Sequence, residues 1–147
     1  MVCRAARRLK QHLGRRGAFL LILGVGKVCW GAGFIAATPT SSSGLGVLTR
    51  LCSLSHWGWL WVAAGCIMIC SSLVRIGRDK FGFVVALVPP TVWALAYAVA
   101  AIRGDYPRGA WVAVWYLTSH VGVILWAASV PEHSVPRHRR GRRGTAP

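Results

Sequence analysis

The sequence predicts an all-α membrane protein: four transmembrane helices in an antiparallel up-down bundle, with both termini in the cytoplasm. Three observations lead to this prediction. Hydrophobic residues make up 54% of the 147 residues, although the net charge is +15. The charges lie in short runs between four long apolar blocks, each close to the roughly 20 residues that a helix needs to cross a bilayer. Finally, Lys and Arg are concentrated in alternate loops.

The four blocks define the predicted transmembrane domain, 17–130, and its helices, which are 17–37, 57–74, 81–102 and 109–130. None of them has the one-sided hydrophobic period of a surface helix, as expected for helices surrounded by lipid and by each other. A basic N-terminal segment, 1–16, precedes the domain and a basic tail, 131–147, follows it. The tail combines prolines with a run of arginines and cannot form a core, so we expect it to be disordered.

The first block has two other interpretations, which we reject. Arg15 and Arg16 precede an apolar run as in a signal peptide, but the run is long, Lys27 interrupts it and no A-x-A cleavage site follows. Its GVGK stretch is similar to a phosphate-binding loop. That motif needs Gly at its first position and Ser or Thr after the Lys, where this chain has Leu21 and Val28. The block is therefore predicted to be a retained helix.

Charges in the loops predict the orientation. The N-terminal segment carries six Lys or Arg residues, the loop after the second block three and the tail five, all on one side of the membrane. The other two loops carry one and two. Because Lys and Arg remain on the cytoplasmic side, we expect N-in/C-in topology in the inner (cytoplasmic) membrane. Trp and Tyr favour the headgroup level, and several mark the predicted outer ends, namely Trp57, Trp59, Trp61, Tyr106 and Trp111.

Each block places an unusual residue near the middle of the bilayer. A rise of about 1.5 Å per residue puts Lys27 roughly 15 Å from the cytoplasmic end of the first block. His120 in the fourth block, Pro89 and Pro90 in the third and Cys66 in the second fall at about the same level. We therefore predict a polar layer at the midplane that these five residues form.

Lys27 is expected to face protein rather than lipid. Gly17, Gly24 and Gly31 recur every seven residues, and the lysine lies three residues after the second and four before the third. Such a stripe lets helices pack closely, within one chain or between subunits.

The spans contain no acid to pair with Lys27, because the acidic residues all lie at helix ends, namely Asp79, Asp105 and Glu132. The lysine must then lose its proton, meet water or bond carbonyls. The carbonyls of Val85 and Ala86 are available, since Pro89 and Pro90 lack the N–H groups that normally bond them. Two interpretations stay open: an aqueous path, gate or anion site, and a structural lysine packed against the proline break.

The histidine and cysteines have structural interpretations. His120 is expected to be a neutral ring bonded to a neighbouring side chain, with a proton relay as the alternative; the candidate partners are Tyr116, Ser119 and Thr118. Cys66 and Cys70 are one turn apart, so one alternative is that they share a metal ion with His120 or Cys29. Thiols in membrane helices are more often packing residues, so we expect no metal and no cofactor. Only Cys52 lies in an external loop, which leaves no external disulfide within the chain.

The basic tail predicts contact with the bilayer. Its arginines are Arg137, Arg139, Arg140, Arg142 and Arg143. Beside a membrane span they are attracted to anionic lipid headgroups, at about 1 kcal/mol per residue. Nucleic acid is the alternative partner, but the tail has no aromatic residue and no groove-reading element, so we do not expect it.

Three stretches carry a resemblance to a known group of proteins. GWLWVAAG (58–65), GRDKFGF (77–83) and GDYPRGAW (104–111) resemble an uncharacterised family of small four-span membrane proteins of actinobacteria and their phages or prophages. The resemblance covers about residues 15–132. That family has no assigned activity, so the resemblance implies a phage or prophage setting and carries over no functional residues.

We expect a non-enzymatic protein that acts as a holin-like, membrane-permeabilising homo-oligomer, because holins are short, have several spans and usually end in a basic tail. The first alternative is a small transporter or channel for anions. Small multidrug exporters need a Glu in the first helix, whereas this chain has Lys27 there, which argues against cations. The second alternative is an accessory protein, for instance one for superinfection exclusion or partner docking. An enzyme is not expected, since no nucleophile–base pair or metal-ligand spacing is visible.

Overall fold

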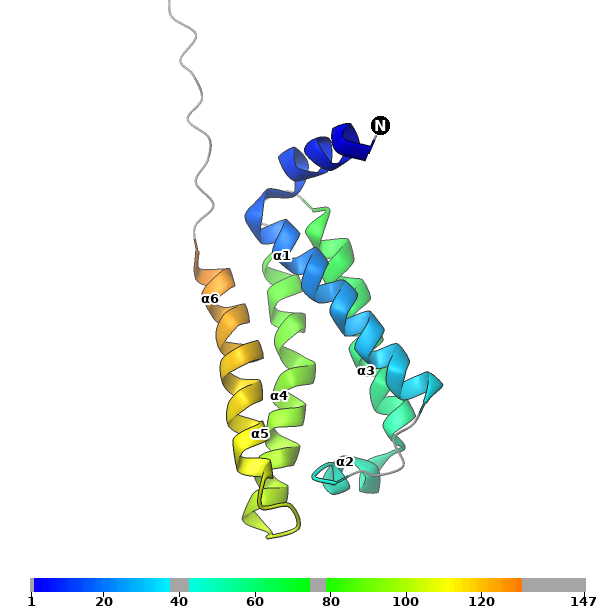
Figure 1. The fold of residues 1–147 in the computed structure, drawn as a ribbon, viewed down its shortest axis with the longest axis vertical. Coiled ribbons are helices and arrows are strands. Elements are labelled where there is room, and N and C mark those ends of the chain that lie inside the picture. The colour runs from blue at the N-terminus through cyan, green and yellow to red at the C-terminus, as the bar shows by residue number, and fades with distance from the viewer. Residues whose placement is uncertain (1, 38–42, 75–78, 131–147) are drawn as a thin grey trace, which may run out of the picture.

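The computed structural model describes residues 2–37, 43–74 and 79–130, and of residues 2–13 the backbone only. Its elements are α1 (Val2–Ala36), α2 (Gly46–Leu51), α3 (Leu54–Ser72), α4 (Lys80–Ile102), α5 (Gly109–Tyr116), the π-helix η1 (Leu117–Gly122) and α6 (Val123–Ser129) (Figure 1). Every element of the described ranges is helical, which confirms the all-α prediction. The tail 131–147, with its five arginines, lies outside the described residues.

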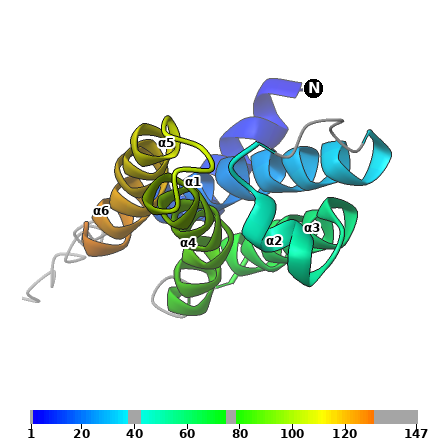
Figure 2. The ribbon, with the colours of Figure 1, turned by 90° about the horizontal axis from the view of Figure 1, so that it is seen from below.

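Four of the helical stretches are long and apolar enough to cross a membrane, as predicted. They are Gly14–Ala36, Leu54–Ser72, Lys80–Ile102 and Gly109–Ser129, and the last consists of α5, η1 and α6. Figure 2 views the molecule from the end at which α2 lies, and α4 appears there between α3 and the α5–α6 stretch. α1 packs chiefly on α3, and α5 packs on α4.

A kink separates the basic N-terminal segment from the first span. Gly14 has φ 57° and ψ −179° inside α1, and a positive φ is adopted readily by glycine because it has no Cβ. The segment before the kink is also helical, which the sequence did not lead us to predict, and it turns away from the axis of the span (Figure 1). The span therefore begins at Gly14 rather than at Gly17.

Facing glycines hold α1 against α3. A Cβ added at Gly24 would lie 2.9 Å from the carbonyl oxygen of Gly65, and one added at Gly31 would lie 2.5 Å from that of Gly58. The two backbones are thus in direct contact. Gly31 lies opposite Gly58, and Gly24 lies opposite Gly65. The glycine stripe is used within the chain, and its partner is a second pair of glycines with the same spacing of seven residues.

Trp93 of α4 joins three elements near the α2 end of the molecule. Its side chain is fully buried, and its ring contacts Phe34 of α1 and Trp57 and Trp61 of α3 at centroid distances of 6.0, 6.2 and 5.2 Å. Edge-to-face aromatic pairs of this kind stabilise by about 0.5–1.5 kcal/mol beyond the area they bury. Trp61 is therefore a core residue, whereas the sequence suggested an anchor at the membrane surface.

The loop after the first span contains the short helix α2, which lies outside the four predicted helices. Leu45 and Leu48 are buried in the same cluster as Trp93, and the indole Nε1–H of Trp57 donates to the Leu48 carbonyl at 3.0 Å. Gly44 has φ +83°, and a Cβ added there would lie 2.5 Å from the Tyr97 ring. The packing of Leu45 and Leu48 in this cluster therefore holds the loop against the bundle.

An ion pair connects α1 and the start of α4 at the opposite end. Arg16 Nε lies 2.9 Å from Asp79 Oδ2, and the Arg16 guanidinium also lies 4.8 Å from the centroid of the Phe83 ring. Asp79 is buried. A charge pair in such a place is stable only when both partners remain, so this contact fixes how the first span enters the bundle.

Candidate functional site

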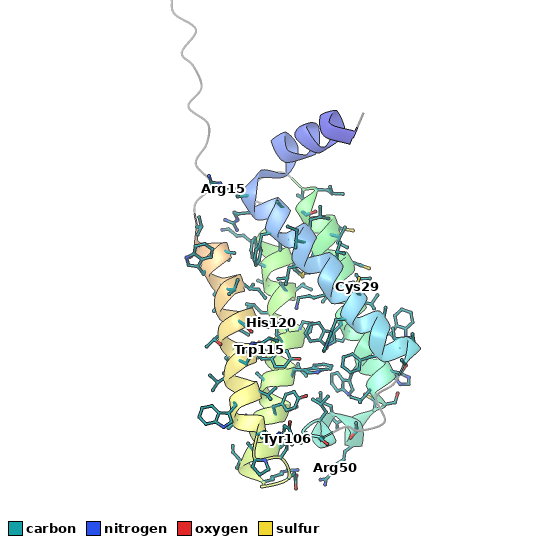
Figure 3. The ribbon with its side chains drawn as sticks, in the orientation of Figure 1. Arg15, Cys29, Arg50, Tyr106, Trp115 and His120 are labelled. Atoms are coloured by element: carbon teal, nitrogen blue, oxygen red, sulfur yellow. The ribbon has the colours of Figure 1, made fainter. Side chains whose placement is uncertain are left out.

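A cavity of about 260 Å³ lies in the middle of the spans. α1, α3, α5 and η1 all contribute to its lining, which consists of Leu23, Gly26, Lys27, Trp30, Trp61, Trp115, Tyr116 and His120. It therefore joins the first span to the fourth, two helices far apart in the sequence. Trp115 and His120 come from neighbouring turns of the fourth span (Figure 3).

Lys27 supplies the amine of this lining. Its side chain is 2% exposed, and its Nζ has no hydrogen-bond partner among the described residues. Lys27 follows Gly24 by three residues and precedes Gly31 by four, so the glycine contact turns it toward α3. At about 1.5 Å per residue it lies roughly 14 Å from the Ala36 end of its helix, near the middle of the Gly14–Ala36 stretch.

Trp61 provides the contact that the amine does have. Lys27 Nζ lies 4.5 Å from the centroid of the Trp61 ring. A desolvated cation over an indole face gains about 2 kcal/mol. This recovers only part of the cost of placing a lysine at the centre of a membrane, which is about 2.5–3.5 kcal/mol on the insertion scale. Part of this cost remains, and a ligand that bonds to the amine would offset it.

His120 faces the cavity from the π-helix. Its Nδ1 lies 2.9 Å from Ser119 Oγ, and its ring lies 5.0 Å from Trp115 and 5.2 Å from Tyr116, centroid to centroid. Of the three candidate partners, Ser119 is the one that hydrogen-bonds, Tyr116 contacts through its ring, and the Thr118 hydroxyl donates to the Val114 carbonyl at 2.9 Å. A π-helix widens the turn and is often found at functional sites.

The structure brings together two of the five residues predicted for a midplane layer. Lys27 and His120 line one cavity. Pro89 and Pro90 are fully buried inside α4 and do not contribute to that lining, and Cys66 is exposed on α3. The suggested bond from the ammonium to the carbonyls beside the prolines is not formed, since the amine has no hydrogen-bond partner in the described part of the chain.

Two further expectations concern metals and packing. Within the ranges that the structure describes, no three His, Cys, Asp or Glu residues are close enough to hold a metal ion. Gly17 and Ser72 are both buried. Gly24 and Gly31 make the close contacts of the glycine stripe, with Gly65 and Gly58 of α3.

The sequence did not identify the aromatic wall. Trp30, Trp61, Trp115 and Tyr116 all line the cavity, yet the tryptophans of the spans were interpreted only as membrane-surface anchors or not at all. One signal was available: Trp30 lies three residues after Lys27, and Tyr116 four before His120, so each shares a helix face with its polar neighbour.

Comparisons with protein-family models, with curated proteins and with solved structures give no match for this chain. Its chemistry must therefore be argued from the cavity. The amine, set among aromatic rings, can bind and orient an anion, and the imidazole of His120 lies in the same lining. The only acidic residue buried in the described ranges is Asp79, and it is paired with Arg16, so it is not available to the amine as a counter-ion.

Proposed function

We infer that this chain is a multi-pass protein of the cytoplasmic membrane that binds a small anion at the midplane and moves it across the bilayer. The carrying observation is Lys27, an amine that is buried, lacks a hydrogen-bond partner in the described residues and lines a cavity. Intramembrane lysines are costly and usually serve substrate or ion pathways. An anion in the cavity would supply the charge partner that the span lacks.

The choice of an anion transporter or channel over a holin-like protein rests on Lys27 and its cavity. The glycine stripe does not separate the two candidates, because the holin interpretation used Gly17, Gly24 and Gly31 for packing between or within subunits. Gly24 and Gly31 pack on Gly65 and Gly58 of the same chain. The holin-like function remains our second candidate, because the cavity separates α1 from α5 and a lesion would open at this seam.

Liposome flux tests the first candidate. Proteoliposomes would be loaded with chloride, nitrate or benzenesulfonate, which stay ionised and do not cross lipid as neutral acids, and valinomycin would balance charge with K⁺. We expect at least one anion to leave faster than from empty liposomes and Lys27→Met to slow it about tenfold or more, since a factor of ten requires only about 1.4 kcal/mol. Lys80→Met removes an exposed lysine and serves as the matched control with unchanged flux.

The outcomes separate the two candidates. Flux that is equal in wild type and Lys27→Met, or absent from all three anions, would overturn the anion function. Release of a neutral solute such as glucose at the same rate in both variants would instead favour the holin-like function. In that case expression in a bacterium should also collapse the membrane potential and permit lysis by a co-expressed endolysin.

The proposed topology is an antiparallel up-down bundle with both termini in the cytoplasm. It rests on the concentration of Lys and Arg in alternate loops. The proposed association with anionic lipid headgroups rests on the basic ends, and the phage or prophage setting on the three motifs described above. The proposed homo-oligomer belongs to the holin-like candidate, in which copies of the chain would assemble around a lesion.

Cysteine labelling in intact cells tests this topology. Cys52 is exposed just before α3, on the side that we propose to be external. In a variant that keeps Cys52 alone, a membrane-impermeant maleimide should react with intact cells. A variant that keeps Cys3 alone should react only after permeabilisation. The reverse pattern would show the opposite orientation.

A further inference from the structure

We propose that the cavity beside Lys27 binds an amphipathic aromatic carboxylate, one or two planar rings that carry a single carboxylate, in preference to inorganic anions. This inference rests on the proposed function, because it names the ligand of the same site. Four observations support it: the chemistry of the walls, their charge, the size of the space and the position of its opening.

The walls are aromatic on several sides. Trp30 comes from α1, Trp61 from α3, and Trp115 and Tyr116 from α5. The Trp61 ring is held in place because its edge-to-face partner Trp93 is itself fully buried. Planar rings pack on such surfaces by offset stacking or edge-to-face contact, whereas a small hydrated ion gains nothing from them.

The polar groups suit one carboxylate. Lys27 Nζ has no hydrogen-bond partner in the described residues and meets only the Trp61 face. The Ser119 hydroxyl donates to the Trp115 carbonyl, so His120 Nδ1 donates to Ser119 Oγ and Nε2 of the neutral ring is an acceptor. The bond to a carboxylate oxygen therefore comes from the ammonium of Lys27, and charge-assisted bonds of this kind are the strong ones.

The space is large enough for a ring system. The cavity measures about 260 Å³, and a cavity of roughly 150 Å³ in a protein core holds one benzene molecule. A Cβ added at Gly26 would meet no atom within 4 Å, so this glycine leaves the α1 side of the cavity open. One or two fused rings therefore fit, and a chloride ion would leave most of the space unfilled.

The opening lies on the surface that faces lipid in a membrane. Trp30 is 52% and Trp115 is 55% exposed, so ligands reach the cavity between α1 and α5 through the apolar zone. A ligand that takes this route must first enter the bilayer. An anion that carries an aromatic ring gains from this route, because its ring is apolar, whereas chloride and nitrate gain nothing from it.

A binding assay on the full chain in nanodiscs tests the proposal. The probe is radiolabelled 2-naphthoate, and scintillation proximity measures the amount bound above protein-free nanodiscs. We expect saturable binding that unlabelled 2-naphthoate displaces and that 2-naphthamide, the uncharged analogue, and chloride do not. Lys27→Met and Trp115→Leu should each weaken binding at least tenfold. Lys80→Met and Trp126→Leu, which alter an exposed lysine and an exposed tryptophan outside the cavity, should leave it within twofold.

Each other outcome overturns the inference. Binding that does not saturate, or that survives Lys27→Met in protein shown to be monodisperse by size exclusion, means that the probe only partitions into lipid. If chloride displaces the labelled probe as effectively as unlabelled naphthoate does, the cavity is a site for inorganic anions. This result overturns the inference but leaves the proposed function in place. The flux assay tests the proposed function independently of this binding assay. If naphthoate binds but anion flux does not depend on Lys27, the proposed function is wrong.

Discussion

Lys27→Met is expected to make the protein more stable to heat while it slows the anion flux about tenfold or more. Methionine is an unbranched, flexible side chain of similar length that fills the same space. A buried donor without a partner costs about 1–3 kcal/mol, and Lys27 Nζ is such a donor within the described residues. Loss of the contact with Trp61 offsets part of the gain. We expect a net gain of about 1 kcal/mol, or about 3 °C in Tm for a chain of this size.

Thermal unfolding in detergent, followed by circular dichroism, measures this effect, and the flux assay is run on the same preparations. Lys80→Met is the control, because it removes an equal charge at an exposed position; neither its Tm nor its flux should change. A variant that is more stable and inactive shows that the lysine is kept for function at a cost in stability. A large fall in Tm for Lys27→Met would mean that the lysine has a structural role instead.

Gly31→Ala and Gly33→Ala are expected to act in opposite directions, although they lie two residues apart on one helix. A Cβ at Gly31 would lie 2.5 Å from the Gly58 carbonyl oxygen and 2.8 Å from Trp61 Cβ, whereas a Cβ at Gly33 would meet nothing within 4 Å. Backbone cannot move aside as the end of a side chain can. Overpacking costs about 1–3 kcal/mol, while Ala for Gly in an open helical position gains about 0.5–1 kcal/mol.

The measurement is again the unfolding midpoint in detergent, with Gly33→Ala as the matched partner of Gly31→Ala. We expect Gly31→Ala to lower the midpoint and Gly33→Ala to leave it unchanged or raise it slightly. Because the contact with α3 also places Lys27 over Trp61, Gly31→Ala should reduce anion flux as well. Equal midpoints for the two variants would show that the close contact of α1 and α3 is not needed for stability.

Most of the fold follows from local features of the sequence. The four spans are long apolar blocks without a helical period, and the observed span limits differ from the expected ones by three residues or fewer. The errors arose where a short signal depended on distant partners. α2 is held in place because Leu45 and Leu48 pack in the same cluster as Trp93 of α4. The helix before the kink at Gly14 is basic and has no long apolar block to indicate it.

The candidate site was predicted in part. Lys27 and His120 are unusual in any membrane span, so the sequence marks them without help from a structure. Trp61 and Trp115 are not unusual, because tryptophan is common in such proteins at the headgroup level. Only the packing of α1, α3 and α5 shows that these rings surround the amine.

The sequence alone determined that the chain is helical, that it has four helices able to span a membrane, and how deep each polar residue lies along its helix. Depth follows from the position in the sequence, because every helical residue adds the same rise. The tertiary structure decided which of those residues face each other. Cys66 shares the expected depth of Lys27 but is exposed on α3, whereas His120 meets the same cavity as the lysine. The direction of a side chain around its helix is set by the contact with the neighbouring helix, here by Gly24 and Gly31 against Gly65 and Gly58, and that contact joins residues far apart in the chain.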